Sequence, residues 1–345
     1  MTTVGIPRGM LFYEFYPMWR AYFHALGVAQ ATSQQPSRRV VDEGILCAVD
    51  EACLPVKVFL GHCLDMSRRC DMLFVPRMVS VEPGAYTCPK LLGLPDMVRA
   101  VPGTAPVLTA VVDYTKRRFA AFGAAIEIGE KLGVSRTRSA RAHAIAVARH
   151  RQFRARLERE EGWFAGACDG AAGYRVQAAR RQAPGPREAR DPREAPDRRE
   201  ARDRRARILV LGHSYVINDA AINLGIKEHI ERMGARAIAP DSVPESVANR
   251  HAAFLPKRLF WTYEKRLFGS AHYCVENGLC DGIIQMMSFG CGPDSLISEL
   301  IRREAGRKRV PYMAMVVDEH TGEAGAVTRL EAYLDMLCSR GMAHS

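Results

Sequence analysis

The sequence predicts an α/β protein in which two doubly wound, mostly parallel sheets are joined by a helical connector. Two observations carry this prediction. Short buried strand segments alternate with helical segments near both ends of the chain, and such alternation is typical of parallel sheets covered by helices. The 345 residues are also 48% hydrophobic, enough for more than one core. We place an N-terminal α/β domain at residues 1–112, the connector at 113–181, a disordered Arg-rich insert at 182–207 and a C-terminal α/β domain at 208–338.

The N-terminal domain begins with a short strand at residues 4–6 and a turn at Pro7-Arg8-Gly9. Aromatic residues then recur at spacings of three and four, which predicts one apolar face of a helix. Further strands are expected at residues 56–60 and 72–75, the second ended by Pro76. The residues of the aromatic face are Phe12, Phe15, Trp19 and Phe23.

The connector is predicted from residues 113–165, which are rich in Ala, Arg, Glu and Leu and contain no proline. Residues 182–207 repeat Arg-Glu-Ala and Arg-Asp units and contain no aromatic residue. Such a segment cannot bury enough apolar surface to offset its ordering entropy. We therefore expect a flexible insert there.

The C-terminal domain begins with a buried strand at residues 208–211 that leads into the loop at His213 and Ser214. Strands are also expected at 282–286 and 312–317, and helices near 218–234, 295–305 and 328–338. Both domains would then be Rossmann- or flavodoxin-like. In such sheets the loops at the carboxyl ends of the strands form the ligand site.

The net charge of +11 is confined to the middle of the chain. Residues 135–159 hold eight Arg and one acid, and residues 180–207 hold eleven Arg and six acids. The remainder is close to neutral, so any nucleic-acid surface would have to lie in this segment. Nucleic-acid association through the Arg-rich middle is therefore disfavoured but stays an alternative.

Composition also predicts a cytoplasmic protein without a membrane segment. No run of about 18 apolar residues is present, and the N-terminus lacks the pattern of a signal peptide. The ten cysteines include no CxxC pair, so neither a secreted disulfide scaffold nor a common zinc site is expected. These cysteines suit a reducing compartment.

Three cysteines are followed closely by proline, in Cys53-Leu-Pro55, Cys88-Pro89 and Cys291-Gly-Pro293. Proline stiffens each turn and removes one N–H, while the other amides stay free to face the sulfur. This pattern predicts the three ligands of one iron-sulfur cluster, with one iron left open to water or substrate. The alternative is that the three thiols simply pack in the core. Cys47 and Cys63 are the reserves for a fourth ligand.

Two loops offer weaker catalytic candidates. His213 and Ser214 could hydrogen-bond a substrate or the cluster, although a loop histidine is more often a packing group. Glu319 and His320 belong to an acidic loop that could transfer protons or could equally form the N-terminal turn of a helix capped by Thr321. No catalytic residue is assigned.

Several long strings, in order, resemble the activase-related family found downstream of the ATPase domain of CoA-substrate-specific enzyme activases. The resemblance covers nearly all of residues 4–100 and 207–338, whereas the Arg-rich insert departs from the family pattern. That family is in turn similar to the subunits of 2-hydroxyacyl-CoA dehydratases, such as 2-hydroxyglutaryl-CoA dehydratase. The strings are GIPRGMLFYEFYP, VDEACLPVKVFLGH, FVPRMVSVE, CPKLLGLPD, LGHSYVIND, SFGCGPDS and VVDEHTGEAGAVTRLEAYLDM.

The resemblance implies a 4Fe-4S cluster held by Cys53, Cys88 and Cys291 in a cleft between the two domains. It also implies anaerobic metabolism, in which an ATP-dependent activase of the ASKHA type delivers low-potential electrons for a difficult reduction or dehydration. The chain has no P-loop, so ATP would be used by that partner. The substrate would be an acyl-CoA or another small molecule, and a homodimer is compatible with the pattern. The alternative is a redox-inactive assembly or regulatory subunit of an activase complex.

Overall fold

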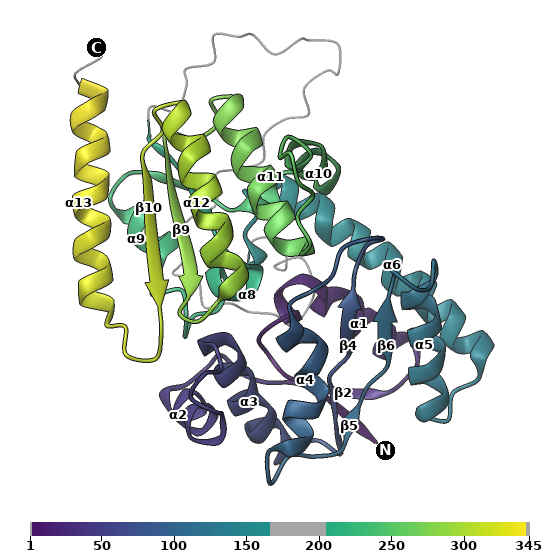
Figure 1. Cartoon of the computed structure of the whole chain (residues 1–345). Coiled ribbons are helices and arrows are strands. Elements are labelled where there is room, and N and C mark those ends of the chain that lie inside the picture. Colours follow the sequence, from purple (N-terminus) through teal and green to yellow (C-terminus); the bar gives the residue numbers. More distant parts are fainter. Residues whose placement is uncertain (1, 166–204, 343–345) are drawn as a thin grey trace, which may run out of the picture.

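The computed structural model describes residues 2–165 and 205–342, and these two stretches form two α/β halves of one molecule (Figure 1). All pairs between the named strands are parallel. The α/β class predicted from the sequence is therefore confirmed. None of the described helices is long and apolar enough to cross a membrane.

The N-terminal half contains a four-stranded sheet of order β2-β1-β3-β5 and a two-stranded sheet of β4 and β6. Its strands are β1 (Thr3–Ile6), β2 (Ala29–Thr32), β3 (Met72–Phe74), β4 (Arg77–Ser80), β5 (Val107–Leu108) and β6 (Val111–Asp113). Its helices are α1 (Phe12–Ala25), α2 (Arg38–Cys47), α3 (Leu54–Ser67), α4 (Pro89–Ala100), α5 (Ala120–Lys131) and α6 (Arg136–Arg159).

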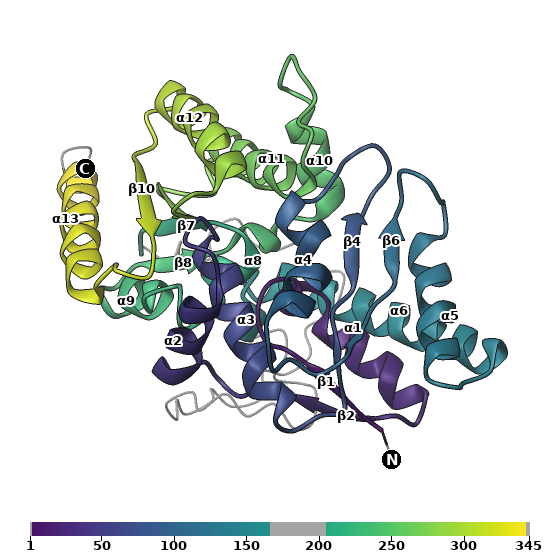
Figure 2. The ribbon, with the colours of Figure 1, turned by 60° about the horizontal axis from the view of Figure 1, so that its bottom comes forward.

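The C-terminal half has one four-stranded sheet of order β10-β9-β7-β8. Helices cover both of its faces, with α11 and α12 on one side and α9 and α13 on the other (Figure 2). Its strands are β7 (Arg207–Leu211), β8 (Arg236–Ile238), β9 (Gly282–Ser288) and β10 (Tyr312–Val317). Its helices are α8 (Ser214–Ile217), α9 (Ile226–Arg232), the short 3₁₀ helix η1 (Pro240–Ser242), α10 (Glu245–Ala252), α11 (Thr262–Glu276), α12 (Gly292–Arg307) and α13 (Glu323–Met342).

One buried core connects the two halves. Phe164, just after α6, packs its ring 5.7 Å from Phe12 and 5.2 Å from Tyr13, both in α1. The indole of Trp163 donates a hydrogen bond to the carbonyl of Ala237 in β8. The residues that follow α6 therefore fasten the first half to the second. The predicted domain limits at 112, 181 and 207 stay predictions, and residues 166–204, which include most of the predicted insert, lie outside the described residues.

One predicted strand is wrong. Residues 56–60 belong to α3, whose residues from Leu54 to Cys63 are all buried. A helix buried on every side has no polar stripe, so its apolar run cannot be told from a buried strand by periodicity. Pro55 occupies the first turn of α3, where it favours a helix start rather than a break.

Two glycines explain why α3 is enclosed so tightly. A Cβ on Gly61 would lie 1.9 Å from the carbonyl oxygen of Val40, and one on Gly44 would lie 2.0 Å from that of Lys57. The backbones of α2 and α3 touch at these positions because no side chain intervenes. This contact fixes the direction of α3 and so the position of its first residue.

The other predicted strands are confirmed with shifted limits. The strands expected at 4–6, 72–75, 208–211, 282–286 and 312–317 correspond to β1, β3, β7, β9 and β10. The helix expected at 218–234 is shorter than predicted: only α9 lies in this range, and the short α8 ends before it, at Ile217. They are separated by turns in which Asp219 and Asn223 accept backbone hydrogen bonds. Gly225 supplies the positive φ of 62° that starts α9.

Candidate functional site

Each of the three proline-flanked cysteines is the N-cap of a helix. Cys53 precedes α3, Cys88 precedes α4 and Cys291 precedes α12, and in each helix a proline lies in the first turn. The first turn of a helix leaves backbone N–H groups free and carries partial positive charge. A thiolate is stabilised at such a position. The chain thus presents its three thiols at three helix starts.

The three thiols are close enough to affect one another electrostatically. Burial raises the pKa of Cys53, the charge of Lys90 opposes this shift, and the Cys291 thiol adds to it. Burial likewise raises the pKa of Cys88, the backbone N–H of Lys90 opposes it, and the thiols of Cys291 and Cys53 add to it. The fold therefore brings together three cysteines that are far apart in the sequence and come from both halves.

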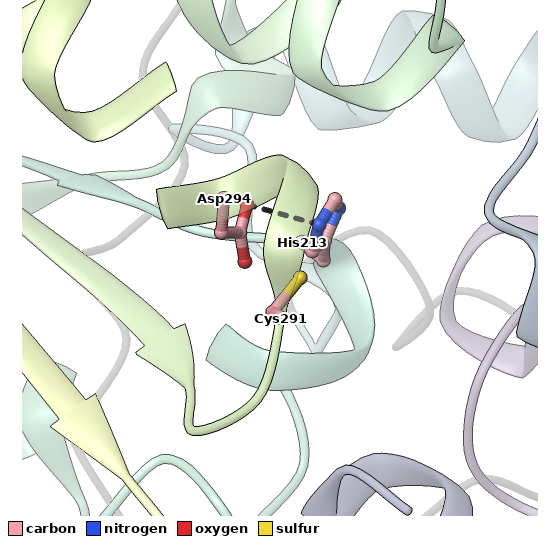
Figure 3. Close-up of side chains that lie close together, drawn as sticks. All are labelled: His213, Cys291 and Asp294. Atoms are coloured by element: carbon pink, nitrogen blue, oxygen red, sulfur yellow. Dashed lines mark ion pairs between the residues drawn. The ribbon is translucent and has the colours of Figure 1, made fainter. Parts of the chain in front are cut away.

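His213 lies beside this group, between β7 and α8. Its side chain is 4% exposed, and its Nε2 is 3.1 Å from Oδ1 of Asp294 and 3.6 Å from Oε1 of Glu264. Figure 3 shows the imidazole next to both Cys291 and Asp294 at the start of α12. Burial alone would lower the pKa of His213, but the charge of Asp294 and hydrogen bonds to Asp294 and Cys291 raise it well above its usual value. Asp294 therefore favours the protonated form of the imidazole beside Cys291.

Tyr215 closes the other side of the imidazole. Its ring is stacked on that of His213, with centroids 4.9 Å apart and planes 13° apart. Burial raises the pKa of the Tyr215 hydroxyl, and Cys291, Asp294, Cys88 and Cys53 raise it further. Tyr215 thus lies within electrostatic range of all three cysteines, and its phenol stays neutral.

A backbone contact between the halves positions Cys88. The N–H of Tyr86 donates to the carbonyl of Phe260 at 3.0 Å, and the N–H of Thr262 donates back to Tyr86 at 2.9 Å. Thr87, the neighbour of Cys88, donates its hydroxyl to the carbonyl of Met78 at 2.6 Å. Because Thr262 is the first residue of α11, the same contact also sets the place of Glu264.

A buried ion pair positions α3 in a similar way. Nζ of Lys57, one turn after Cys53, lies 2.5 Å from Oε1 of Glu319 in the loop after β10. The Lys57 side chain is 3% exposed and that of Glu319 is 20% exposed. The hydrogen bond from Lys57 lowers the pKa of Glu319, so the Glu319 carboxylate is ionised and already paired with Lys57. Glu319 acts here as the partner of Lys57.

The rest of the acidic loop has the geometry of a turn. The Thr321 hydroxyl donates to Oδ1 of Asp318 at 2.6 Å and accepts from the Asp318 N–H. His320 is exposed and donates its backbone N–H to Asp318. Ser214 is half-buried in the first turn of α8, next to His213. Of the weaker candidates, His213 is the one that directly contacts a predicted cysteine ligand.

The reserve ligands belong to a different group of thiols. Cys63 is fully buried, and its pKa is raised well above the usual value by burial and then by Cys47 and Cys70. Cys274 and Cys280 are buried in the C-terminal half. Cys168 and the side chain of Cys338 lie outside the described residues.

Sequence reasoning missed Asp294, Glu264 and Tyr215. Asp294 could have been found from its place in the first turn of the helix after Cys291, where an acidic residue is favoured by the helix dipole. Glu264 carried no local signal, because it lies within a helix that the sequence analysis did not predict. Their meeting at His213 is a consequence of tertiary structure alone.

Two overlapping sets of donors could hold a metal group. The three cysteines offer soft thiolate ligands, which suit an iron-sulfur cluster. His213, Cys291 and Asp294 offer one nitrogen, one sulfur and one oxygen within 4.8 Å of one another, which could hold a single ion. Within the described residues, neither carboxylate oxygen of Asp294 nor Nδ1 of His213 completes a hydrogen bond of good geometry. Buried polar atoms without partners are uncommon, so these atoms could accept a further group.

Comparison with known proteins gives one family. The model of the CoA enzyme activase uncharacterised domain (DUF2229) matches residues 3–243, which include Cys53, Cys88 and His213 but end before Cys291. No curated protein matches the chain. Among solved structures, the chain is similar to the glycosyltransferase SnogD from Streptomyces nogalater, with 13% identity and a TM-score of 0.19 over 100% of both chains. A likeness this weak carries no argument about fold or function.

Proposed function

Because the chain belongs to the family of the CoA enzyme activase uncharacterised domain, we propose that it is a 4Fe-4S protein of the 2-hydroxyacyl-CoA dehydratase-like class. It accepts low-potential electrons from an ATP-dependent activase and passes them to a bound substrate in a difficult reduction or dehydration. The observation that carries the proposal is the meeting of Cys53, Cys88 and Cys291 at three helix N-termini. When bound, the cluster would supply a one-electron carrier with one iron not ligated by cysteine.

The surroundings of the cysteines favour an anionic group. A cluster bound by the three cysteines would carry negative charge, and the free N–H groups of three helix starts, the Lys90 side chain and His213 would offset it. Each positive group also stabilises an added electron, since reduction makes the site more negative. We infer that these residues set the reduction potential of the site.

His213 has a specific part in this proposal. Its Nε2 lies 3.1 Å from Oδ1 of Asp294, and the imidazole also interacts with the side chain of Cys291. The stacked Tyr215 excludes water from the ring face. We propose that His213 orients Cys291 and neutralises it, while Asp294 keeps the imidazole protonated.

The two α/β halves support the proposed arrangement of two domains. We propose that they are two Rossmann- or flavodoxin-like domains with the cluster between them, in a cytoplasmic protein. Two ligands come from the first half and one from the second, and the contacts Tyr86–Phe260 and Lys57–Glu319 hold the halves together around them. The partner that hydrolyses ATP would bind at the outer surface of the protein.

The test is iron content after anaerobic purification. Cys53→Ala, Cys88→Ala and Cys291→Ala should each lose the iron and sulfide of the native protein, while the core variant Cys274→Ala should keep them. Cys274 is a matched control because it is buried in α11 and its pKa of about 12, raised by burial, keeps it a thiol. Equal iron in all four variants would falsify the proposal.

A single metal ion is the second candidate, and the cluster of His213, Cys291 and Asp294 favours it. In that case Cys291→Ala would lose the metal, whereas Cys53→Ala and Cys88→Ala would keep it. A native protein that binds no metal in either way would favour the redox-inactive assembly or regulatory subunit.

A further inference from the structure

A cavity of about 310 Å³ lies apart from the three cysteines, mainly in the N-terminal half, with Glu245 and Arg266 of the C-terminal half at one end. Helices α1, α5 and α6 and the sheet of β4 and β6 form its walls, and these elements lie side by side in Figure 2. Volumes near 300 Å³ are typical of small-molecule sites, whereas well-packed cores leave few voids larger than a water molecule.

The cavity exists because one wall is built from small side chains. Ala121, Ala124 and Ala125 of α5 and Ala146 of α6 line it, opposite the large rings of Phe15 and Trp19 in α1. Alanine favours a helix but leaves space that leucine at the same position would fill. The alanines thus keep the helices regular and the space open.

One end of the cavity is polar, and its charges are already paired. Arg266 donates to Glu14 at 2.9 Å and to Glu245 at 2.7 Å, and Arg154 donates to Asp241 at 2.8 Å. Two guanidinium groups therefore face three carboxylates. An anionic ligand would add negative charge to a group that already carries an excess of it, which disfavours a free carboxylate.

His150 supplies an open hydrogen-bonding position at the same end. Its ring is stacked on Phe15 with centroids 5.3 Å apart. Burial, followed by the charges of Arg154 and Arg266, lowers its pKa to about 4, so the imidazole is neutral at pH 7. Its buried Nδ1 has no hydrogen-bond partner in the described parts of the chain. A neutral imidazole can donate or accept one hydrogen bond.

We propose that this cavity binds a neutral, mainly apolar small molecule that carries one hydrogen-bonding group, such as an amide, an alcohol or an ester. The apolar part lies among the alanines and aromatic rings, and the polar group reaches His150 at the end lined by Arg154 and Arg266. This binding does not depend on whether the cysteines hold a cluster.

The position of the polar end gives the site a connection to the cysteines. A smaller cavity of about 40 Å³ shares Glu14, Arg154, Glu245 and Arg266 with the large one, and His213 also lines it. The paired charges therefore stand between the apolar cavity and the His213 side of the cysteine site. A ligand bound as proposed would have its polar group directed to that boundary.

The test uses the fluorescence of N-phenyl-1-naphthylamine, a neutral apolar probe, with the full chain. The probe should bind the native protein and be displaced by octanamide or 1-octanol about tenfold more readily than by octanoate. Ala146→Leu, which fills the cavity, should weaken probe binding about tenfold, whereas Ala144→Leu, the same change on the exposed side of α6, should change it by less than about twofold. Ala124→Leu repeats the test from α5 if Ala146→Leu does not fold.

His150→Phe separates the polar contact from the apolar one. It keeps a ring to stack on Phe15 and removes Nδ1, so octanamide should bind about tenfold more weakly. Equal displacement by octanamide and octanoate would overturn the assigned ligand class. Probe binding that is absent, or that is the same in the filling variants and Ala144→Leu, would overturn the site itself.

Discussion

Nε2 of His213 lies 3.1 Å from Oδ1 of Asp294, and the two side chains are 4% and 1% exposed. These residues are far apart in the chain and meet because β7 and β9 are neighbours in one sheet. His213 contacts Cys291 of the candidate site directly. Asp294 lies in α12, the helix whose N-cap is Cys291. The pair therefore links the folding of the C-terminal half to the geometry of the site.

Breaking this pair from one side should be more harmful than removing both charges. His213→Gln leaves the buried Asp294 carboxylate without its cation, which should cost about 3–5 kcal/mol of unfolding free energy. The double variant His213→Gln/Asp294→Asn removes both charges and should recover about 1–3 kcal/mol of that loss. Urea unfolding of the metal-free protein measures both values. Strictly additive effects would mean that the two side chains are not coupled.

Removing one partner of the Lys57–Glu319 pair should cost more unfolding free energy when the partner left behind is the more deeply buried one. Glu319→Gln leaves the nearly inaccessible Lys57 ammonium without its carboxylate and should cost about 1–3 kcal/mol. Lys57→Met leaves Glu319, which water can still reach, and should cost less. Urea midpoints of the two variants decide this, with the exposed Glu331→Gln as a control for the loss of one negative charge. A larger loss for Lys57→Met would contradict this account.

Asp219 should make the protein less stable as the pH rises. Burial raises its pKa to about 6, against 3.8 for the free group, although Ala221 N–H and the Tyr13 hydroxyl donate to it. The folded state thus binds a proton between these pH values that the unfolded state has lost. The stabilisation is fully present below pH 3.8, declines as the pH rises through the window from 3.8 to 6, and is lost above pH 6.

The matching variant is Asp219→Asn, which has no proton to lose. Relative to it, the native protein should lose up to about 3 kcal/mol of unfolding free energy between pH 4 and pH 7. Urea unfolding of both proteins across this range measures the difference. A difference that does not change with pH would show that Asp219 does not titrate in this window.

The parts of the site that could be predicted from sequence are those with a local signal. Cys53, Cys88 and Cys291 each stand next to a proline that marks a helix start, and the structure places each at an N-cap. His213 follows an unmistakably apolar strand, which is β7. In these cases the residues that determine the backbone lie within a few positions of the functional side chain.

The parts that could not be predicted depend on contacts between distant segments. Residues 56–60 were expected to be a strand because α3 is surrounded by apolar neighbours and so lacks a polar face. Glu264 and Asp294 become important only when α11 and α12 pack beside each other. The cavity in the N-terminal half likewise arises from the spacing of α1, α5 and α6, although their helical character was partly predicted.

The most direct test of the central claim is the amount of iron and acid-labile sulfide per chain after strictly anaerobic purification, together with the EPR spectrum of the reduced protein. The account predicts about four iron and four sulfide per chain and the signal of a reduced 4Fe-4S cluster. A well-folded protein that contains no iron or sulfide, or a single metal ion without sulfide, would contradict it.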